Sequence, residues 1–212
     1  GRWVTLLWTG EAVLLFWIGR TSGVRFYEIT SYVLVYLAFF SIVSLWGPSE
    51  ELRSLQPSAP RLIPFLNISF LTSMIFSAAM WFIVQLERSS KHPSPLISQA
   101  GFRQLVSFTF AAILLLALYF TFSTEISRHF NQLYAASLSE MSQVSEGRTF
   151  KFYNDDIRMF KIVWLINYTL LFFSAISFFN IIKVKDRNWG FINLGLNTLA
   201  LLIFLSVGLF TL

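Results

Sequence analysis

Apolar and polar segments alternate along this chain, and the apolar segments are long. About six apolar runs occupy residues 3–18, 27–46, 62–86, 102–122, 160–182 and 189–212. An α-helix of about 20 apolar residues crosses the ~30 Å hydrocarbon core of a bilayer, because it satisfies its own backbone hydrogen bonds there. The pattern therefore predicts an all-α, polytopic transmembrane helical bundle of about six spans, in a single domain covering residues 1–212.

The longest segment between spans, residues 123–156, carries a second pattern. Apolar residues recur there at helical spacing, while charged and amide residues occupy the other side. The apolar set is Ile126, Phe130, Leu133, Tyr134, Leu138 and Met141. This spacing predicts an amphipathic helix over residues 124–141, followed by a loop over residues 145–156. We expect the helix either to lie in the membrane interface or to prolong the fourth span.

Composition and charge agree with a membrane protein. Of the 212 residues, 55% are hydrophobic and 13% are charged, whereas soluble domains carry about 25% charged residues. The formal net charge of +5 does not indicate nucleic acid, because the basic residues lie in short segments that flank the apolar runs. Basic residues are densest in the short hairpins 20–25 and 183–188, which predicts that both hairpins face the cytoplasm. The expected partner is the lipid bilayer, and no nucleic acid is expected.

Candidate chemistry is sparse. The absence of cysteine excludes disulfides, thiolate metal sites and a cysteine nucleophile. The two histidines, His92 and His129, fall in predicted loop or interfacial segments, where they are poorly placed as axial ligands of a haem between membrane helices. No nucleotide-binding glycine loop, nucleophile elbow or zinc spacing is present. The sequence thus offers no catalytic, metal or haem residues and implies no cofactor, and it favours a role other than catalysis.

One acidic residue, Glu11, lies in the interior of an apolar run, far from both ends of that run. A charge at the bilayer centre costs about 2.5–3.5 kcal/mol on insertion scales, so such a residue usually has a partner or faces water. Two interpretations follow: a proton or cation site, or a neutral carboxyl group hydrogen-bonded to a neighbouring helix. Under either interpretation we expect a polar partner from another helix, or an internal water.

Amide side chains form the second candidate polar site, with Asn167 in the fifth run and Asn193 and Asn197 in the sixth. Asn193 and Asn197 are four residues apart and share one helix face. They are therefore placed to hydrogen-bond a neighbouring span, either as polar contacts between helices or as part of a ligand site.

Residues 8–20 read WTGEAVLLFWIGR. This segment resembles a recurring helix of a bacterial family of long polytopic membrane proteins, the domain of unknown function 2339 family. The segment from Phe160 to Phe179, which contains the stretch Trp164 to Tyr168, is similar to the later part of such proteins. The resemblance implies that this chain is the C-terminal part of a longer protein of the bacterial cytoplasmic membrane, in keeping with apolar runs at both ends. It implies no known activity.

Three functions remain open. The first is a structural or interaction segment, contacting other transmembrane helices of the same longer chain or of a membrane complex. The second is part of a transporter or of a proton or ion pathway that uses Glu11. The third is a membrane enzyme acting on a lipid-linked substrate, which would rest on the polar segment 123–156.

Overall fold

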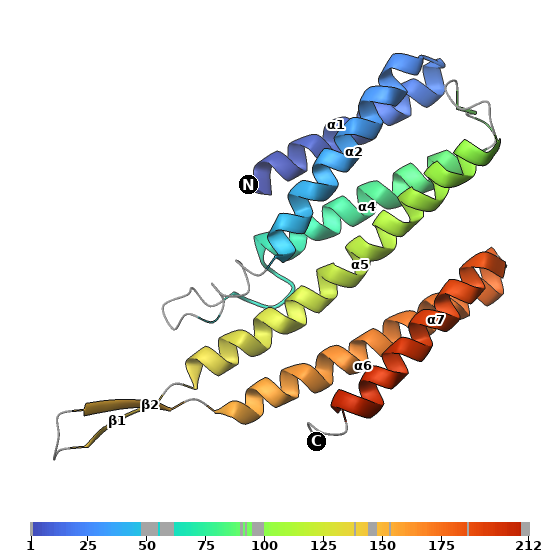
Figure 1. Cartoon of the computed structure of the whole chain (residues 1–212). Helices are drawn as coiled ribbons and strands as arrows, with labels where there is room; N and C mark the ends of the chain where they lie inside the picture. Colours follow the sequence, from blue (N-terminus) through green and yellow to red (C-terminus); the bar gives the residue numbers. More distant parts are fainter. Residues whose placement is uncertain are drawn as a thin grey trace. The chain divides into compact units, whose positions relative to one another are not determined.

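A computed structural model describes residues 2–47, 55, 62–89, 91, 93–94, 100–137, 139–143, 148–152, 154–185 and 187–208. Within these residues the regular structure is helical apart from one pair of short antiparallel strands (Figure 1). The elements are α1 (Arg2–Ser22), α2 (Arg25–Trp46), α4 (Ile68–Arg88), α5 (Ala100–Ala136), β1 (Ser139–Gln143), β2 (Arg148–Phe152), α6 (Asp155–Phe179), η1 (Asn180–Val184), α7 (Arg187–Ile203) and η2 (Phe204–Gly208). The two η segments are π-helical.

The predicted helical bundle is confirmed. Five helices in the described part are long and apolar enough to cross a membrane: α2, α4, α5, α6 and α7. The first predicted run also forms a helix, α1, but it is not among these five. Its apolar character is lowered by Glu11, Arg20 and several threonine, glycine and tryptophan residues. Of the roughly six predicted spans, five are therefore supported by length and composition.

The third helix begins later than its apolar run suggested. Residues 62–66 lie outside it, and α4 starts at Ile68 instead of Leu62. Asn67 caps the helix, because its side-chain oxygen accepts a hydrogen bond from the Phe70 amide at 2.9 Å. Phe65 has a φ of 63°, which no helix accommodates. Pro64 therefore lies in a turn before α4 and not in its first helical turn.

The predicted amphipathic helix is part of α5, a single helix of 37 residues that continues the fourth span to Ala136. Of our two alternatives, prolongation of the span is the one observed. The predicted end at Met141 was wrong, since residues 139–143 form β1, which pairs antiparallel with β2. The loop predicted over residues 145–156 likewise contains β2 and the start of α6. In residues 148–152, RTFKF, Phe alternates with Thr and Lys, and this period of two is typical of a strand.

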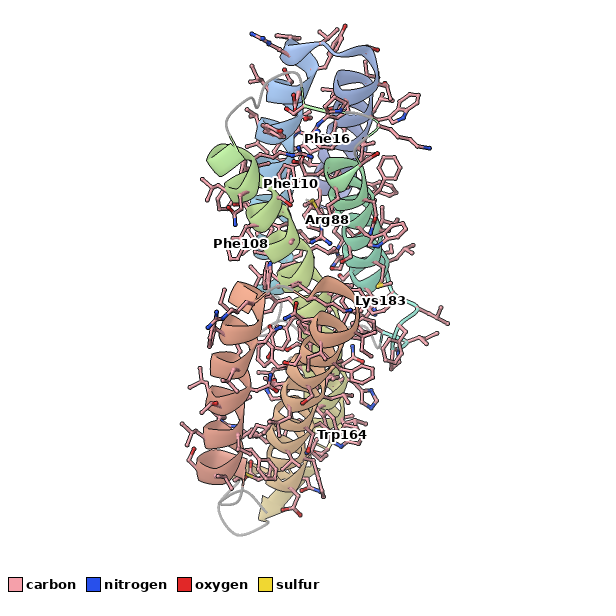
Figure 2. The ribbon with its side chains drawn as sticks, turned by 90° about the vertical axis from the view of Figure 1, so that its right-hand side faces the viewer. Phe16, Arg88, Phe108, Phe110, Trp164 and Lys183 are labelled. Carbon is pink, nitrogen blue, oxygen red and sulfur yellow. The ribbon has the colours of Figure 1, made fainter. Side chains whose placement is uncertain are left out.

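The chain divides into two compact units, residues 1–50 with 62–122 and residues 51–61 with 123–212. In the first unit, α1 packs against α2 and α4. Its core contains Ala12, Phe16, Val35, Ala38, Ile42, Phe76, Met80, Ile83, Val84, Phe110, Ile113 and Ala117. The rings of Phe16, Tyr32 and Phe110 contact one another, with centroids 5.5–6.1 Å apart, and so join α1, α2 and α5 (Figure 2).

In the second unit α6 packs against α7. The connection between them is η1 followed by Lys185, whose left-handed φ of 54° ends the helical path. The second part of α5 also belongs to this unit, and its buried positions are largely polar: Glu125, Arg128, Asn131 and Ala135. On its apolar side Leu133 is 43% exposed. The helix thus turns its polar face inward, which suits a surrounding of lipid.

Candidate functional site

A cluster of charged side chains is buried where helices of the first unit end or begin. Arg20 lies at the end of α1, Glu28 in the first turn of α2 and Glu87 at the end of α4. Their side chains are 0%, 0% and 1% exposed. Ionised groups so deeply buried must pair closely, because their desolvation costs several kcal/mol each. We call these three residues, with the groups bonded to them, the charge cluster.

Arg20 is the centre of the charge cluster. Its Nε lies 3.0 Å from Glu28 Oε1, and its Nη2 pairs with Glu87 Oε2. The planar guanidinium group presents several donors in a fixed geometry, so one arginine can bind two carboxylates on different helices. Its carbon Cζ also lies 5.0 Å from the centroid of the Phe16 ring. A single side chain therefore links α1 to both α2 and α4.

Neutral donors and a second arginine complete the charge cluster. Glu28 Oε1 accepts hydrogen bonds from the Tyr32 hydroxyl at 2.8 Å and from the Ser94 hydroxyl at 2.6 Å. Glu87 Oε1 lies 4.0 Å from Nε of Arg103, which is 48% exposed. Within the described residues, these ion pairs contain arginines and glutamates in equal number. With its glutamates closed to solvent, the cluster is built to hold helices together and offers little access to a substrate.

Backbone geometry brings α1 and α2 close enough for this pairing. A β-carbon on Gly19 would lie 2.8 Å from the Glu28 amide nitrogen, a distance that real β-carbons do not show. Glycine therefore allows the end of α1 to touch the start of α2. The chain reverses between them at Gly23, which has a φ of 67°. Near the other end of the hairpin, the hydroxyl groups of Thr5 and Ser41 are hydrogen-bonded at 2.6 Å.

Glu11 lies away from this charge cluster and faces outward from α1. Within the described residues it has no hydrogen bond or ion pair, so the polar partner that we predicted for it is not found there. Its height along the hairpin follows from two contacts between α1 and α2. Glu11 falls between the Thr5–Ser41 bond and the Arg20–Glu28 pair, and this places it beside the middle of α2, which is long and apolar enough to cross a membrane.

The predicted amide site is brought together only in part. Asn197 joins α7 to α6: its Nδ2 donates to Ser177 Oγ at 2.9 Å and to the Phe173 carbonyl at 3.3 Å. The same Nδ2 lies 2.8 Å from the carbonyl of Asn193, whose own side chain is buried. Asn167 is separate, since its Nδ2 donates to the Val163 carbonyl on its own helix. Asn197 therefore makes a polar contact between α6 and α7.

A second buried polar group occurs in the second unit. Arg128 Nη1 lies 3.3 Å from Glu125 Oε2, one turn apart on α5. On the same helix, Asn131 accepts a hydrogen bond from Lys161 Nζ at 3.1 Å, which links α5 to α6. His129 lies on this stretch of α5, whereas His92 lies outside the described residues. No group of three or more acidic or histidine side chains in the described part is placed to hold a metal ion.

The charge cluster was not predicted from the sequence. Arg20 was placed in the hairpin 20–25, and the third apolar run was ended at residue 86, just before Glu87. One signal was available: Arg20 and Glu28 have opposite charges on either side of a short hairpin, so they had to lie near each other. The participation of Glu87 depends on the packing of α4 against α1, which no local pattern encodes.

Comparisons with known proteins add no relative: no family model, curated protein or solved structure matches this chain.

Proposed function

We propose that this chain is a structural and interaction segment of a larger membrane protein or complex, in a bacterial cytoplasmic membrane. The observation that carries the proposal is the position of Glu11, an outward-facing carboxyl group beside the middle of a potential membrane span, with no partner among the described residues. A bare carboxylate at that height is costly in lipid. Contact with a further membrane helix removes that cost.

Two further features support this role. The buried glutamates of the charge cluster and its central arginine are occupied with one another, which suits a scaffold of fixed helices. In addition, the sequence WTGEAVLLFWIGR resembles a helix of the domain of unknown function 2339 family, whose proteins are long and polytopic. Under this proposal the hairpins 20–25 and 183–188 face the cytoplasm.

The proposal is tested by the mass of the particle that contains the chain. Native membranes are extracted directly into polymer-bounded lipid discs, without detergent, and the particle is analysed by native mass spectrometry. We expect the mass of the particle to exceed the combined mass of this chain and its lipids. The additional mass would come from further polypeptide, either in the same longer chain or in other subunits. Particles that hold this chain alone, in a single copy, would contradict the proposal.

A proton or ion pathway is the second candidate, favoured by the same carboxyl group at mid-height. Under that reading, Glu11→Gln should abolish proton uptake by vesicles containing the protein while leaving the yield of folded protein intact. A purely structural role predicts that wild type and variant give the same proton flux.

A further inference from the structure

The outward face of α1 carries a regular stripe of exposed residues. Trp3, Leu7, Leu14 and Trp17 are 80%, 59%, 53% and 48% exposed, and Gly10 lies among them. Their spacing of three and four residues places them on one side of the helix. A β-carbon added at Gly10 would have no heavy atom within 4 Å. The stripe therefore has a flat centre with large apolar side chains above and below it.

A groove borders this stripe. It lies between α1 and α4 and has a volume of about 550 Å³. Gly10, Leu14 and Trp17 of the stripe belong to its lining, and Ile75, Ala79 and Phe82 form its α4 side. Large side chains of a neighbouring helix could enter the groove while the backbone of that helix approaches Gly10. Small residues at such positions let membrane helices come close together.

Glu11 follows Gly10 in the sequence and is exposed. It lies about 100° around the helix axis from Gly10, at the edge of this face, so a docked helix must reach it with a long side chain. Arg2 and Arg20, near the two ends of α1, are each nine residues from Glu11, roughly 13 Å along the helix at 1.5 Å per residue, so lipid headgroups at either end do not reach Glu11. A group that compensates an ionised carboxylate at this height must therefore come from within the membrane. A lysine or arginine side chain on a membrane helix has the complementary charge. Placed alone in the bilayer it also has a free-energy cost, so the ion pair with Glu11 stabilises both partners.

We propose that the Gly10 face of α1 docks a transmembrane helix of another polypeptide that carries a lysine or arginine near its middle, paired with Glu11. This inference rests on the proposed function and names the chemistry of the partner. The apolar stripe and the groove provide the packing area, and the charge pair sets the height at which the two helices align.

The test uses synthetic transmembrane peptides as defined probes. The full chain is reconstituted in phosphatidylcholine vesicles and labelled at one introduced cysteine, since it has none of its own. Association is measured by energy transfer to leucine-alanine helices that carry lysine, glutamine or leucine at the centre, or lysine near one end. We expect the central-lysine helix to bind about tenfold tighter than the other three, which corresponds to 1.4 kcal/mol.

Two variants and one control locate the interaction. Glu11→Gln should remove the preference for central lysine, and Gly10→Leu should weaken binding by blocking the close approach. Gly195→Leu is the matched control, because Gly195 on α7 also has no heavy atom within 4 Å of an added β-carbon. It should bind like the wild type. Equal binding of the lysine and leucine peptides, or an unchanged lysine preference in Glu11→Gln, would overturn the inference. Equal binding of the glutamine peptide would show that an amide suffices, which also overturns it.

Failure of this inference can be told apart from failure of the proposed function. If the native assembly exists and remains intact with both Glu11→Gln and Gly10→Leu, the interaction role stands and the docking face lies elsewhere. If native lipid discs contain a single copy of this chain alone, the interaction role itself fails, whatever the peptides do.

Discussion

Removing the guanidinium group of Arg20 should destabilise the first unit strongly. Arg20→Met keeps most of the aliphatic length but leaves the carboxylates of Glu28 and Glu87 buried, at 0% and 1% exposure, without their shared cation. Breaking a buried pair by removing one partner typically costs about 3–5 kcal/mol. Loss of the contact with the Phe16 ring adds about 0.5–1 kcal/mol. Arg103 is close enough to Glu87 to compensate in part, so we expect a loss of about 3 kcal/mol in the free energy of unfolding.

The assay is reversible unfolding in mixed micelles as the fraction of sodium dodecyl sulfate is raised, followed by tryptophan fluorescence and circular dichroism. Arg88→Met is the matched control, because Arg88 neighbours the charge cluster in sequence but is exposed. It should change stability by less than about 0.5 kcal/mol. Adding Glu28→Gln and Glu87→Gln to Arg20→Met should recover most of the loss, because the unpaired charges are then gone. If Arg20→Met matches the Arg88 control, the cluster does not hold the helices together.

Three further results are expected. Gly19→Ala should destabilise the isolated chain by about 1–3 kcal/mol in the same assay, because the methyl group meets the facing backbone of α2, whereas Gly10→Ala should cause no loss; equal effects would argue against the close approach. Asn197→Ala should cost about 0.6–1.7 kcal/mol by removing hydrogen bonds between α6 and α7. The change Asn167→Ala should be nearly silent, and a reversed order of these two losses would refute the assignment. A single cysteine at Ser22 should resist an impermeant thiol reagent in intact cells and react after lysis, and labelling in intact cells would reverse the proposed orientation.

The helices could be predicted from the sequence because lipid demands long apolar runs, and such runs are visible without knowledge of packing. Their ends were less predictable. Leu62 is as apolar as the residues that follow, but the asparagine cap at Asn67 decides where α4 begins. The end of α5 was missed because the helical spacing of apolar residues continues to Met141, although the pairing of β1 with β2 determines the conformation there.

The candidate site was predicted only in part. Two asparagines on one face of a membrane helix need partners, and Asn197 hydrogen-bonds to Ser177 on the neighbouring helix. The outward direction of Glu11 could not be derived, since the side of α1 that packs against α2 depends on Gly19 and on the pairing of Arg20. Charged residues at the ends of the apolar runs were interpreted as lying at the membrane surface. Packing of α1, α2 and α4 instead brings Arg20 and two glutamates together in the interior of the first unit.

The inward-facing polar surfaces of these helices have a thermodynamic consequence. The buried face of α4 includes Ser69, Thr72, Ser73, Ser77 and Glu87, and that of α5 includes Thr121, Glu125, Arg128 and Asn131. The large heat-capacity change of ordinary unfolding arises from apolar surface newly exposed to water. Separation of these helices within a lipid or micelle brings their buried apolar and polar side chains into contact with acyl chains rather than with water. Calorimetry should therefore find a small heat-capacity change per residue, and the free energy of unfolding should vary almost linearly with temperature.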